Sequence, residues 1–262
     1  MRAFFRVVRA QLRASLALAL QYRLEFFIEG GMTLFWQAVA LVPLWVVFGK
    51  RASIAGWTFP EALLVIGWFV ALKAFLEGAM NPSLLAVIEH VRKGTLDFVL
   101  LKPVDAQILV SVAKVEPWKV IDILGAGAIF VYAFRAMHRA PTLSQLAAAA
   151  AMLVTALLVL YSIAILVVCI AIIAVRVDNL MYLFQSIFDA ARWPSTIFRG
   201  VFAIVFTFVL PLALMTTYPA LALLGRLSLP TALGAFAGTL GFAAVSRLAW
   251  RAAMGRYTSA SS

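Results

Sequence analysis

Few residues in this chain have a type and spacing that could support catalysis. The two histidines, His90 and His138, are 48 positions apart and do not form a metal-ligand pattern. The single cysteine, Cys169, lies in an apolar run and cannot form an internal disulfide. No G-x-x-x-x-G-K-[ST] motif occurs, so the chain has no phosphate-binding loop of its own. The sequence therefore indicates neither a metal site nor an ATPase within this chain.

Ionisable residues inside otherwise apolar runs are the second group of candidates. Lys73 and Glu77 are four positions apart, so they can pair along one face of a helix. Lys119 and Asp122 form a similar pair near the start of another run, and Glu29 lies just inside the first run. No chain of carboxylates and histidines runs through these segments, which argues against proton-coupled transport.

The elements that must position these residues are strongly apolar. The 262 residues are 65% hydrophobic and 13% charged, with a mean hydropathy of +1.01, whereas a soluble chain is about half apolar and about a quarter charged. Four stretches contain no Asp, Glu, Lys or Arg, and a helix of about 20 such residues crosses a bilayer. They are residues 30–49, 140–175, 200–225 and 227–246. The composition therefore predicts a polytopic helical membrane protein.

The net charge of +11 does not indicate nucleic-acid binding, because the basic residues are dispersed between apolar runs. Their distribution predicts the orientation instead. With the N-terminus inside, sixteen Lys and Arg residues fall on inner segments and five on outer segments. The positive-inside rule then places both termini in the cytoplasm.

We predict an all-α membrane protein with two parts. Residues 1–24 are expected to form an amphipathic interfacial helix, with a basic stripe that faces anionic lipid. Residues 25–262 are expected to form a single six-span transmembrane domain. The stripe consists of Arg2, Arg6, Arg9 and Arg13, and the spans are expected at residues 26–48, 60–80, 117–137, 143–175, 201–217 and 231–250.

Charges within spans are costly and are usually functional. Lys73, Glu77 and Asn81 are therefore the translocation-pathway candidates of the second span. For Lys73 and Glu77, a structural pair that faces the helix bundle is the favoured interpretation, and contact with the cavity is the alternative.

The inner loop over residues 81–116 is long enough to contain structure of its own. Asn81-Pro82-Ser83 is expected to end the second span and begin a new helix, with Pro in its first turn. That helix would run over about residues 84–93 and end at Gly94, a residue suited to the C′ position. A capped, charged cytoplasmic helix is suited to docking a soluble partner. A solvated connector, the alternative, would rarely contain so many apolar residues.

Two later segments are amphipathic or broken. Residues 178–193 place polar residues on one helical face and Phe184 and Phe188 on the other, which predicts a second interfacial or bundle-flanking helix. Residues 212–229 contain proline and glycine breaks, which are tolerated at membrane depth where the backbone is shielded or lines a cavity. They predict a re-entrant outer segment before the sixth span. A short outer loop after a kinked fifth span is the alternative.

Several short motifs are similar to those of a known family. The cytoplasmic loop contains an R-x-G-T-L-D-F…L-K-P pattern, and Trp-Pro and Tyr-Pro-Ala motifs follow later in the chain. With the six spans, this pattern resembles the permease subunit of a type 2 ABC exporter, of the paired-permease family that carries the cytoplasmic motif. The residues are Val91-Arg92-Lys93-Gly94-Thr95-Leu96-Asp97-Phe98, Leu100-Leu101-Lys102-Pro103-Val104, Trp193-Pro194 and Tyr218-Pro219-Ala220.

The resemblance implies that a separate ABC ATP-binding subunit binds ATP and Mg²⁺, and that this chain holds no cofactor itself. It also implies a second permease subunit, related or identical, a bacterial plasma (inner) membrane, and a coupling helix over Leu84–Lys102 that inserts into the ATPase. The ATPase-coupling candidates are Leu84, Ile88, Glu89, Arg92, Lys93, Gly94, Asp97 and Lys102.

The predicted function is export of an amphipathic or hydrophobic solute, as in drug efflux, through a largely apolar cavity shared by two permeases. Translocation of a lipid or lipid-linked product by the same architecture is the first alternative. A non-transporting membrane scaffold is the second. A membrane-embedded enzyme would need several polar residues at one depth, and the spans offer too few.

Overall fold

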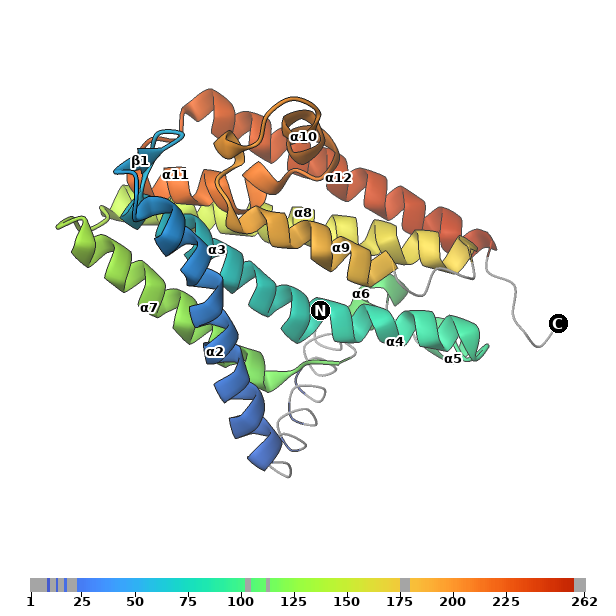
Figure 1. Cartoon of the computed structure of the whole chain (residues 1–262). Coiled ribbons are helices and arrows are strands. Elements are labelled where there is room, and N and C mark those ends of the chain that lie inside the picture. Colours follow the sequence, from blue (N-terminus) through green and yellow to red (C-terminus); the bar gives the residue numbers. More distant parts are fainter. Residues whose placement is uncertain are drawn as a thin grey trace.

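The computed structural model describes residues 23–101, 105–111, 114–174 and 180–256, together with Arg9, Arg13 and Ala17. Almost the whole of the predicted interfacial helix over residues 1–24 lies outside this part of the chain. Figure 1 shows long helices gathered into a bundle, with short helices at both ends and along its upper side.

The described part of the chain is helical apart from the connecting turns and one short β-hairpin, as an all-α membrane protein requires. Within the described residues, five helices are long and apolar enough to cross a bilayer. They are α2 (Arg23–Phe48), the continuous helix α3–η1–α4 (Phe59–Phe75, Leu76–Met80, Asn81–Arg92), η2–α7 (Pro117–Lys119, Val120–Ala136), α8 (Leu143–Ala174) and α12 (Leu229–Arg256).

The centre of the bundle is α3. This helix is apolar on all sides and almost completely buried, which is typical of a core helix. It packs against α7 and against the segment η6–α11, while α12 packs along α8. In contrast, α2 packs mainly along η2–α7 and α3 and exposes large apolar side chains, among them Trp36 and Trp45.

The second span does not end where the sequence predicts. Asn81-Pro82-Ser83 was expected to break it, but the helix continues from Phe59 to Arg92 through the π-helical turn η1. Pro82 has no N–H to donate to the preceding turn. The Gly78 carbonyl, four residues earlier, therefore lacks its usual helical donor. It accepts the backbone N–H of Glu116, in the loop that follows α6, at 2.7 Å. The first part of the predicted coupling segment, as far as Arg92, is therefore the end of the second span.

The predicted fifth span over residues 201–217 is not one helix. The chain breaks at Leu210–Pro211, because proline restricts the preceding residue to an extended conformation. Residues 212–229 do not form a hairpin by themselves, since residues 213–224 form a single buried helical unit that ends at Gly225 with a φ of 69°. The elements are α9 (Leu180–Phe188), η3 (Asp189–Arg192), η4 (Ser195–Ile197), α10 (Val201–Ile204), η5 (Val205–Val209), η6 (Ala213–Thr217) and α11 (Tyr218–Leu224).

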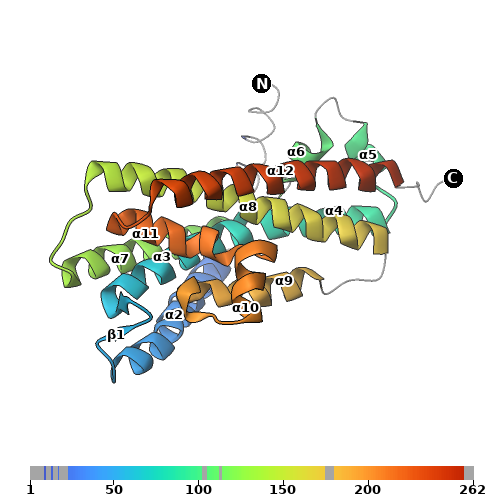
Figure 2. The same ribbon diagram turned by 90° about the horizontal axis from the view of Figure 1, so that it is seen from above.

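The connections gather at two opposite ends of the bundle, as Figure 2 shows. One end, the hairpin end, carries β1 (Ser53–Ile54), β2 (Trp57–Thr58) and the turns that precede α8 and α12. The other, the loop end, carries the end of α4, α5 (Asp97–Leu100), α6 (Ala106–Ser111) and the end of α12.

Candidate functional site

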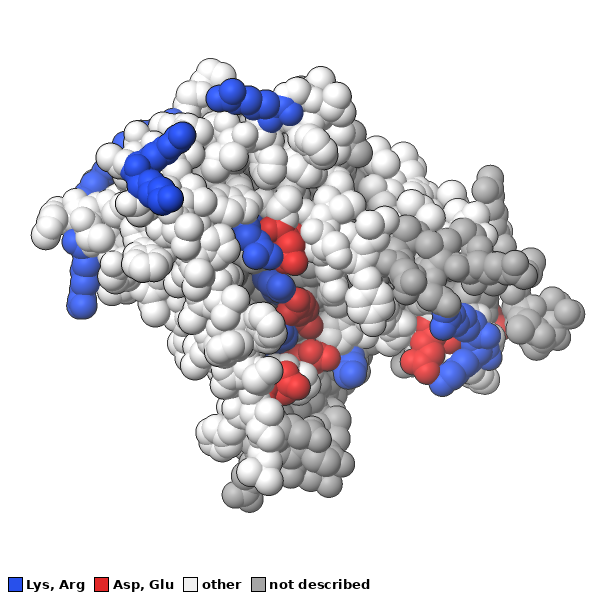
Figure 3. Space-filling model, in the orientation of Figure 1, with Lys and Arg blue, Asp and Glu red and all other residues white. Residues whose placement is uncertain are grey.

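A charged cleft lies between α2, α3, α7 and η3. Its volume is about 640 Å³. One wall comes from α2 and is mainly apolar, with Met32, Trp36 and Pro43, although it also carries Glu29 and Gln37, while the opposite wall carries the other ionisable residues of the cleft. Figure 3 shows basic and acidic side chains alternating along this face, with uncharged surface on both sides of the row.

The charges of the cleft form a continuous ladder. Lys73 Nζ lies 3.4 Å from Asp189 Oδ1 and 3.6 Å from Glu77 Oε1. Lys119 Nζ lies 2.6 Å from Glu77 Oε2 and 3.7 Å from Asp122 Oδ2. The ladder therefore connects three parts of the bundle, namely η3, the continuous helix α3–η1, and the continuous helix η2–α7.

Both ends of the ladder have further partners. Arg192 Nη2 lies 3.3 Å from Asp189 Oδ1, and the Arg192 guanidinium stands 5.4 Å from the centre of the Phe69 ring. At the other end, the Gln37 side-chain amide on α2 donates to Asp122 Oδ1 at 2.6 Å. The three basic and three acidic groups balance one another, so the ladder places no net charge at membrane depth.

Close helix packing holds the ladder in register. A Cβ atom on Gly78 would lie 2.9 Å from Lys119 Cβ, and one on Gly125 would lie 2.0 Å from Gln37 Oε1. Glycine is therefore favoured at Gly78, where the Cβ of Lys119 lies against the helix, whereas at Gly125 the mobile end of the Gln37 side chain could give way. Phe69 also stacks on Phe188, with ring centres 5.4 Å apart, and fixes α9 against α3.

The loop end forms the second part of the candidate site. The helix α4 ends at Gly94, which has a φ of 64° as a C′ glycine requires. Beyond it the chain turns through α5, where Phe98 is 70% exposed and Leu101 is 81% exposed. Such large apolar side chains on a polar loop are typical of an interaction surface.

A polar network fastens this loop to the bundle. Arg247 on α12 forms an ion pair with Asp105 and donates to Gln107 Oε1 at 2.6 Å. The Gln107 amide donates to the Tyr161 hydroxyl on α8 at 3.1 Å, and Ser111 lies 2.8 Å from the same hydroxyl. The loop is therefore attached to α8 and α12 through α6.

A second attachment joins the loop to the π-helical turn. The buried Ser83 hydroxyl donates to the Lys114 carbonyl at 2.8 Å and accepts the Lys114 N–H at 3.0 Å. The Glu116 N–H bond to Gly78 follows directly. Burial raises the pKa of the Glu116 carboxyl, although Lys114 and Lys119 oppose this effect.

A family model described as ABC-2 family transporter protein matches residues 34–261. The chain belongs to this family. It is a type 2 ABC permease, the membrane component of a transporter that works with an ATP-binding subunit. No curated protein and no solved structure matches the chain.

In this ABC-2 permease, two of the three predicted pathway residues lie in the cleft. The spacing of Lys73 and Glu77 predicted their pairing, and the 3.6 Å contact confirms it. The pair also lines the cleft, so the structural and pathway roles are compatible. Asn81 does not line the cleft, and its buried side-chain amide has no hydrogen-bond partner among the described residues.

The predicted coupling residues divide into two groups. Leu84 is fully buried and Ile88 is partly buried against the core, so Leu84 anchors α4 and cannot contact a partner. Glu89, Arg92 and Lys93 are exposed, and Gly94 and Asp97 are half-buried. Lys102 lies outside the described residues.

Sequence reasoning missed several residues of the site. Asp189 and Arg192 were assigned to a flanking helix, and nothing in their spacing connects them with Lys73. The only sequence feature that distinguishes Gln37 is that it is a polar residue within an apolar span. Phe98 and Leu101 were recognised only as part of a motif.

Proposed function

We propose that this permease is one half of an ATP-driven exporter for an amphipathic or hydrophobic solute. A separate ATP-binding subunit docks on the loop end, and a second permease, related or identical, completes the translocation pathway. In this proposal the loop end faces the cytoplasm of a bacterial cell, as the distribution of basic residues predicts.

The observation that carries the proposal is the continuous helix from Phe59 to Arg92. At a rise of 1.5 Å per residue, it is about 50 Å long. Its inner end joins the exposed surface around Phe98, and its middle carries Lys73 and Glu77. A displacement of the loop is therefore transmitted to the cleft along a single helix.

The loop cannot move alone, because its other connections also lead into spans. The Arg247–Asp105 pair leads to α12, and the Gln107–Tyr161 bond leads to α8. ATP-driven closure of the ATPases would move these three helices together, which is the kind of rigid-body change that alternates access to a cavity.

The cleft also fits the proposed substrate class. The sequence favoured a largely apolar cavity, but the cleft has one mainly apolar wall, which also carries Glu29, and one wall of paired charges. An amphipathic solute can place its apolar part against Trp36 and Met32 and its polar part toward the ladder.

The test begins with purification of the full-length chain in mild detergent and identification of the proteins that accompany it. We expect a Walker-motif ATPase in equal number to total permease. Phe98→Glu should release this ATPase and abolish its stimulation by the permease, because it places a charge in a desolvated contact. Leu143→Glu, which alters a similarly exposed apolar residue at the hairpin end, is the matched control.

The two variants distinguish the outcomes clearly. If Phe98→Glu retained the ATPase at the wild-type ratio, the loop end would not be the docking surface. If no ATPase accompanied the wild-type chain even after gentle crosslinking, the proposed exporter would be wrong.

A further inference from the structure

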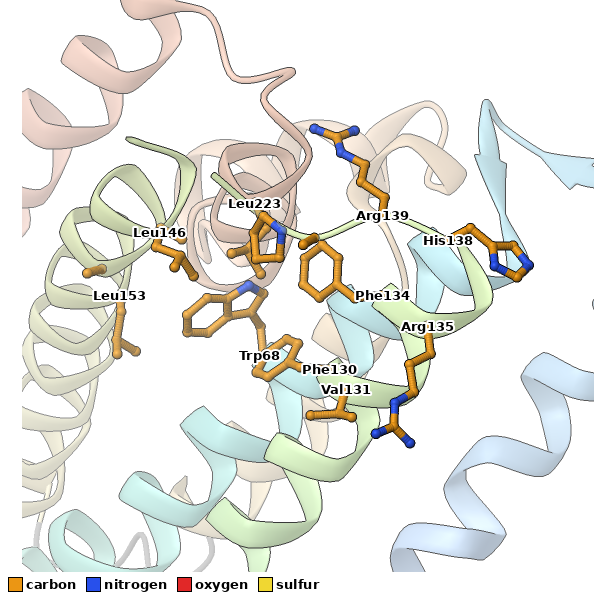
Figure 4. A pocket seen from close by; sticks show the side chains of 14 residues that line it. Trp68, Phe130, Val131, Phe134, Arg135, His138, Arg139, Leu146, Leu153 and Leu223 are labelled. Atoms are coloured by element: carbon orange, nitrogen blue, oxygen red, sulfur yellow. The ribbon is translucent and has the colours of Figure 1, made fainter. Parts of the chain in front are cut away.

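A second cavity lies at the hairpin end of the bundle, on the other side of α3 and α7 from the charged cleft. Its volume is about 850 Å³, within the usual range for ligand sites. Figure 4 shows its walls, which come from α3, α7, α8 and α11. They include Trp68, Phe130, Phe134, Leu146, Leu153 and Leu223.

This pocket opens sideways, between α7 and α8. Val131 and Leu146, which line it, are large apolar residues with about half of their surface exposed. Exposed apolar residues on two membrane-spanning helices face acyl chains and not water. The pocket is therefore entered from the bilayer.

The floor of the pocket contains an unused hydrogen-bond donor. Trp68 is only 7% exposed, and its indole N–H has no acceptor among the described residues. Phe130 packs edge-on against the indole at 5.1 Å, and Figure 4 shows the indole between the side chains of α7 and α8. A buried donor without a partner is unfavourable, so an occupant with an oxygen acceptor would satisfy it.

The rim of the pocket is basic. Arg135, His138 and Arg139 line it at the end of α7. The Arg139 guanidinium donates to the Leu224 carbonyl at 3.1 Å, but none of the three residues pairs with a carboxylate in the described part of the chain. The rim thus attracts an anionic group at the level where lipid headgroups lie.

We propose that this pocket binds one molecule of an anionic glycerophospholipid. One acyl chain occupies the space between Phe130 and Leu153, an oxygen of the lipid's linkage region accepts the Trp68 N–H, and the headgroup lies against Arg135 and Arg139. A zwitterionic lipid lacks the net charge that the rim selects. This site is independent of the proposed export function, because it needs neither the ATPase nor the cleft.

The test measures retained lipid by native mass spectrometry of the full-length chain with its associated subunits. The protein is exchanged into phosphatidylglycerol or phosphatidylcholine with identical acyl chains. We expect phosphatidylglycerol to be retained preferentially. Arg135→Gln with Arg139→Gln should weaken its binding about tenfold or more, since each basic residue near an anionic surface contributes appreciably.

Two controls separate the pocket from general electrostatics. Lys50→Gln with Arg51→Gln removes two basic residues at the same end that do not line the pocket, and it should leave retention unchanged. Ala150→Trp fills the pocket from an exposed lining position and should displace the lipid, whereas Ala148→Trp, at an exposed position of the same helix that does not line the pocket, should not.

Equal retention of the two lipids would overturn the proposal. So would equal losses in the Arg135/Arg139 and Lys50/Arg51 variants, or recovery of a compound other than lipid that Ala150→Trp displaces. None of these results would bear on whether an ATPase binds the loop end.

Discussion

The charged cleft and the lipid-facing pocket share the same two helices but differ in how their polar groups are satisfied. Phe69 and Lys73 of α3 line the cleft, while the adjacent Trp68 lines the pocket. In the cleft, each of the six ladder charges has a partner within the protein. In the pocket, the indole N–H has no acceptor and the basic rim no carboxylate among the described residues.

This difference separates a structural role from a binding role. Charges that neutralise one another hold helices together and offer little to a small ion, whereas groups without partners favour an external ligand. The number of charges around a cavity is therefore a poor guide to what it binds. The cleft is the more charged of the two cavities, but the six charges of its ladder are paired, whereas the pocket combines an indole N–H without an acceptor and a basic rim without a carboxylate among the described residues.

The largest predicted effect comes from removing the central base of the ladder. Lys119→Met leaves Asp122 without a basic partner and Glu77 with Lys73 alone. The groups are partly buried, so the loss should approach but not reach the value of about 3–5 kcal/mol for a fully buried pair. We expect a correspondingly lower unfolding temperature in detergent.

Lys93→Met is the matched control for that variant. Lys93 lies 2.6 Å from Glu89, the same distance that separates Lys119 from Glu77, but both residues are more than 60% exposed. Its loss should leave the unfolding temperature almost unchanged, because water screens an exposed pair. Equal effects of the two substitutions would show that the ladder is solvated and does not hold the helices together.

The ladder also shows how far sequence reasoning reaches. The i, i+4 spacing was sufficient to predict the Lys73–Glu77 pair, because both residues lie on one helix. The Lys73–Asp189 and Lys119–Glu77 contacts join residues 116 and 42 positions apart and depend on tertiary packing. The broken fifth span was the main error, since a chain that is apolar throughout residues 200–225 does not reveal where it leaves the bundle.

The proline at position 82 illustrates a different limit. Taken alone, Asn-Pro-Ser is a sound signal for the start of a helix. The helix continues because the Glu116 N–H donates to the Gly78 carbonyl in place of the N–H that Pro82 lacks. No local sequence pattern predicts a hydrogen-bond donor that lies 34 positions after Pro82. The all-α membrane fold and the family were predictable because they depend on composition and local motifs.

Substitutions at two glycines of the continuous helix should have effects of intermediate size. They compare the packing beside the cleft with the packing beside the pocket. A Cβ on Gly78 would meet Lys119 Cβ at 2.9 Å, and one on Gly67 would meet the Phe130 ring at 2.7 Å. The Phe130 ring borders the open pocket and can swing aside, whereas Lys119 is held by Glu77 and by the adjacent Glu116–Gly78 bond.

Gly78→Ala should therefore lower the free energy of unfolding by about 1–3 kcal/mol, the usual range for overpacking. Gly67→Ala should cost less, although its initial contact is closer. Thermal unfolding of both variants in the same detergent checks the ranking. A larger loss for Gly67→Ala would mean that Phe130 is fixed and that the pocket is rigid.

The smallest predicted effect concerns Glu116, at the inner edge of the bundle beside the ladder. Burial raises the pKa of this carboxyl above its ordinary value near 4.5. The folded protein therefore binds this proton more tightly than the unfolded chain, and stability falls as the pH rises through the raised pKa.

Glu116→Gln tests whether stability falls as the pH rises, because it removes the titrating carboxyl and keeps the backbone N–H that donates to the Gly78 carbonyl. We expect the variant to be slightly more stable than wild type at neutral pH and equal to it at pH values below the ordinary pKa, when unfolding is measured across that range. The opposite sign would mean that Lys114 and Lys119 outweigh burial, and Glu116 would then belong to the charge-balanced ladder.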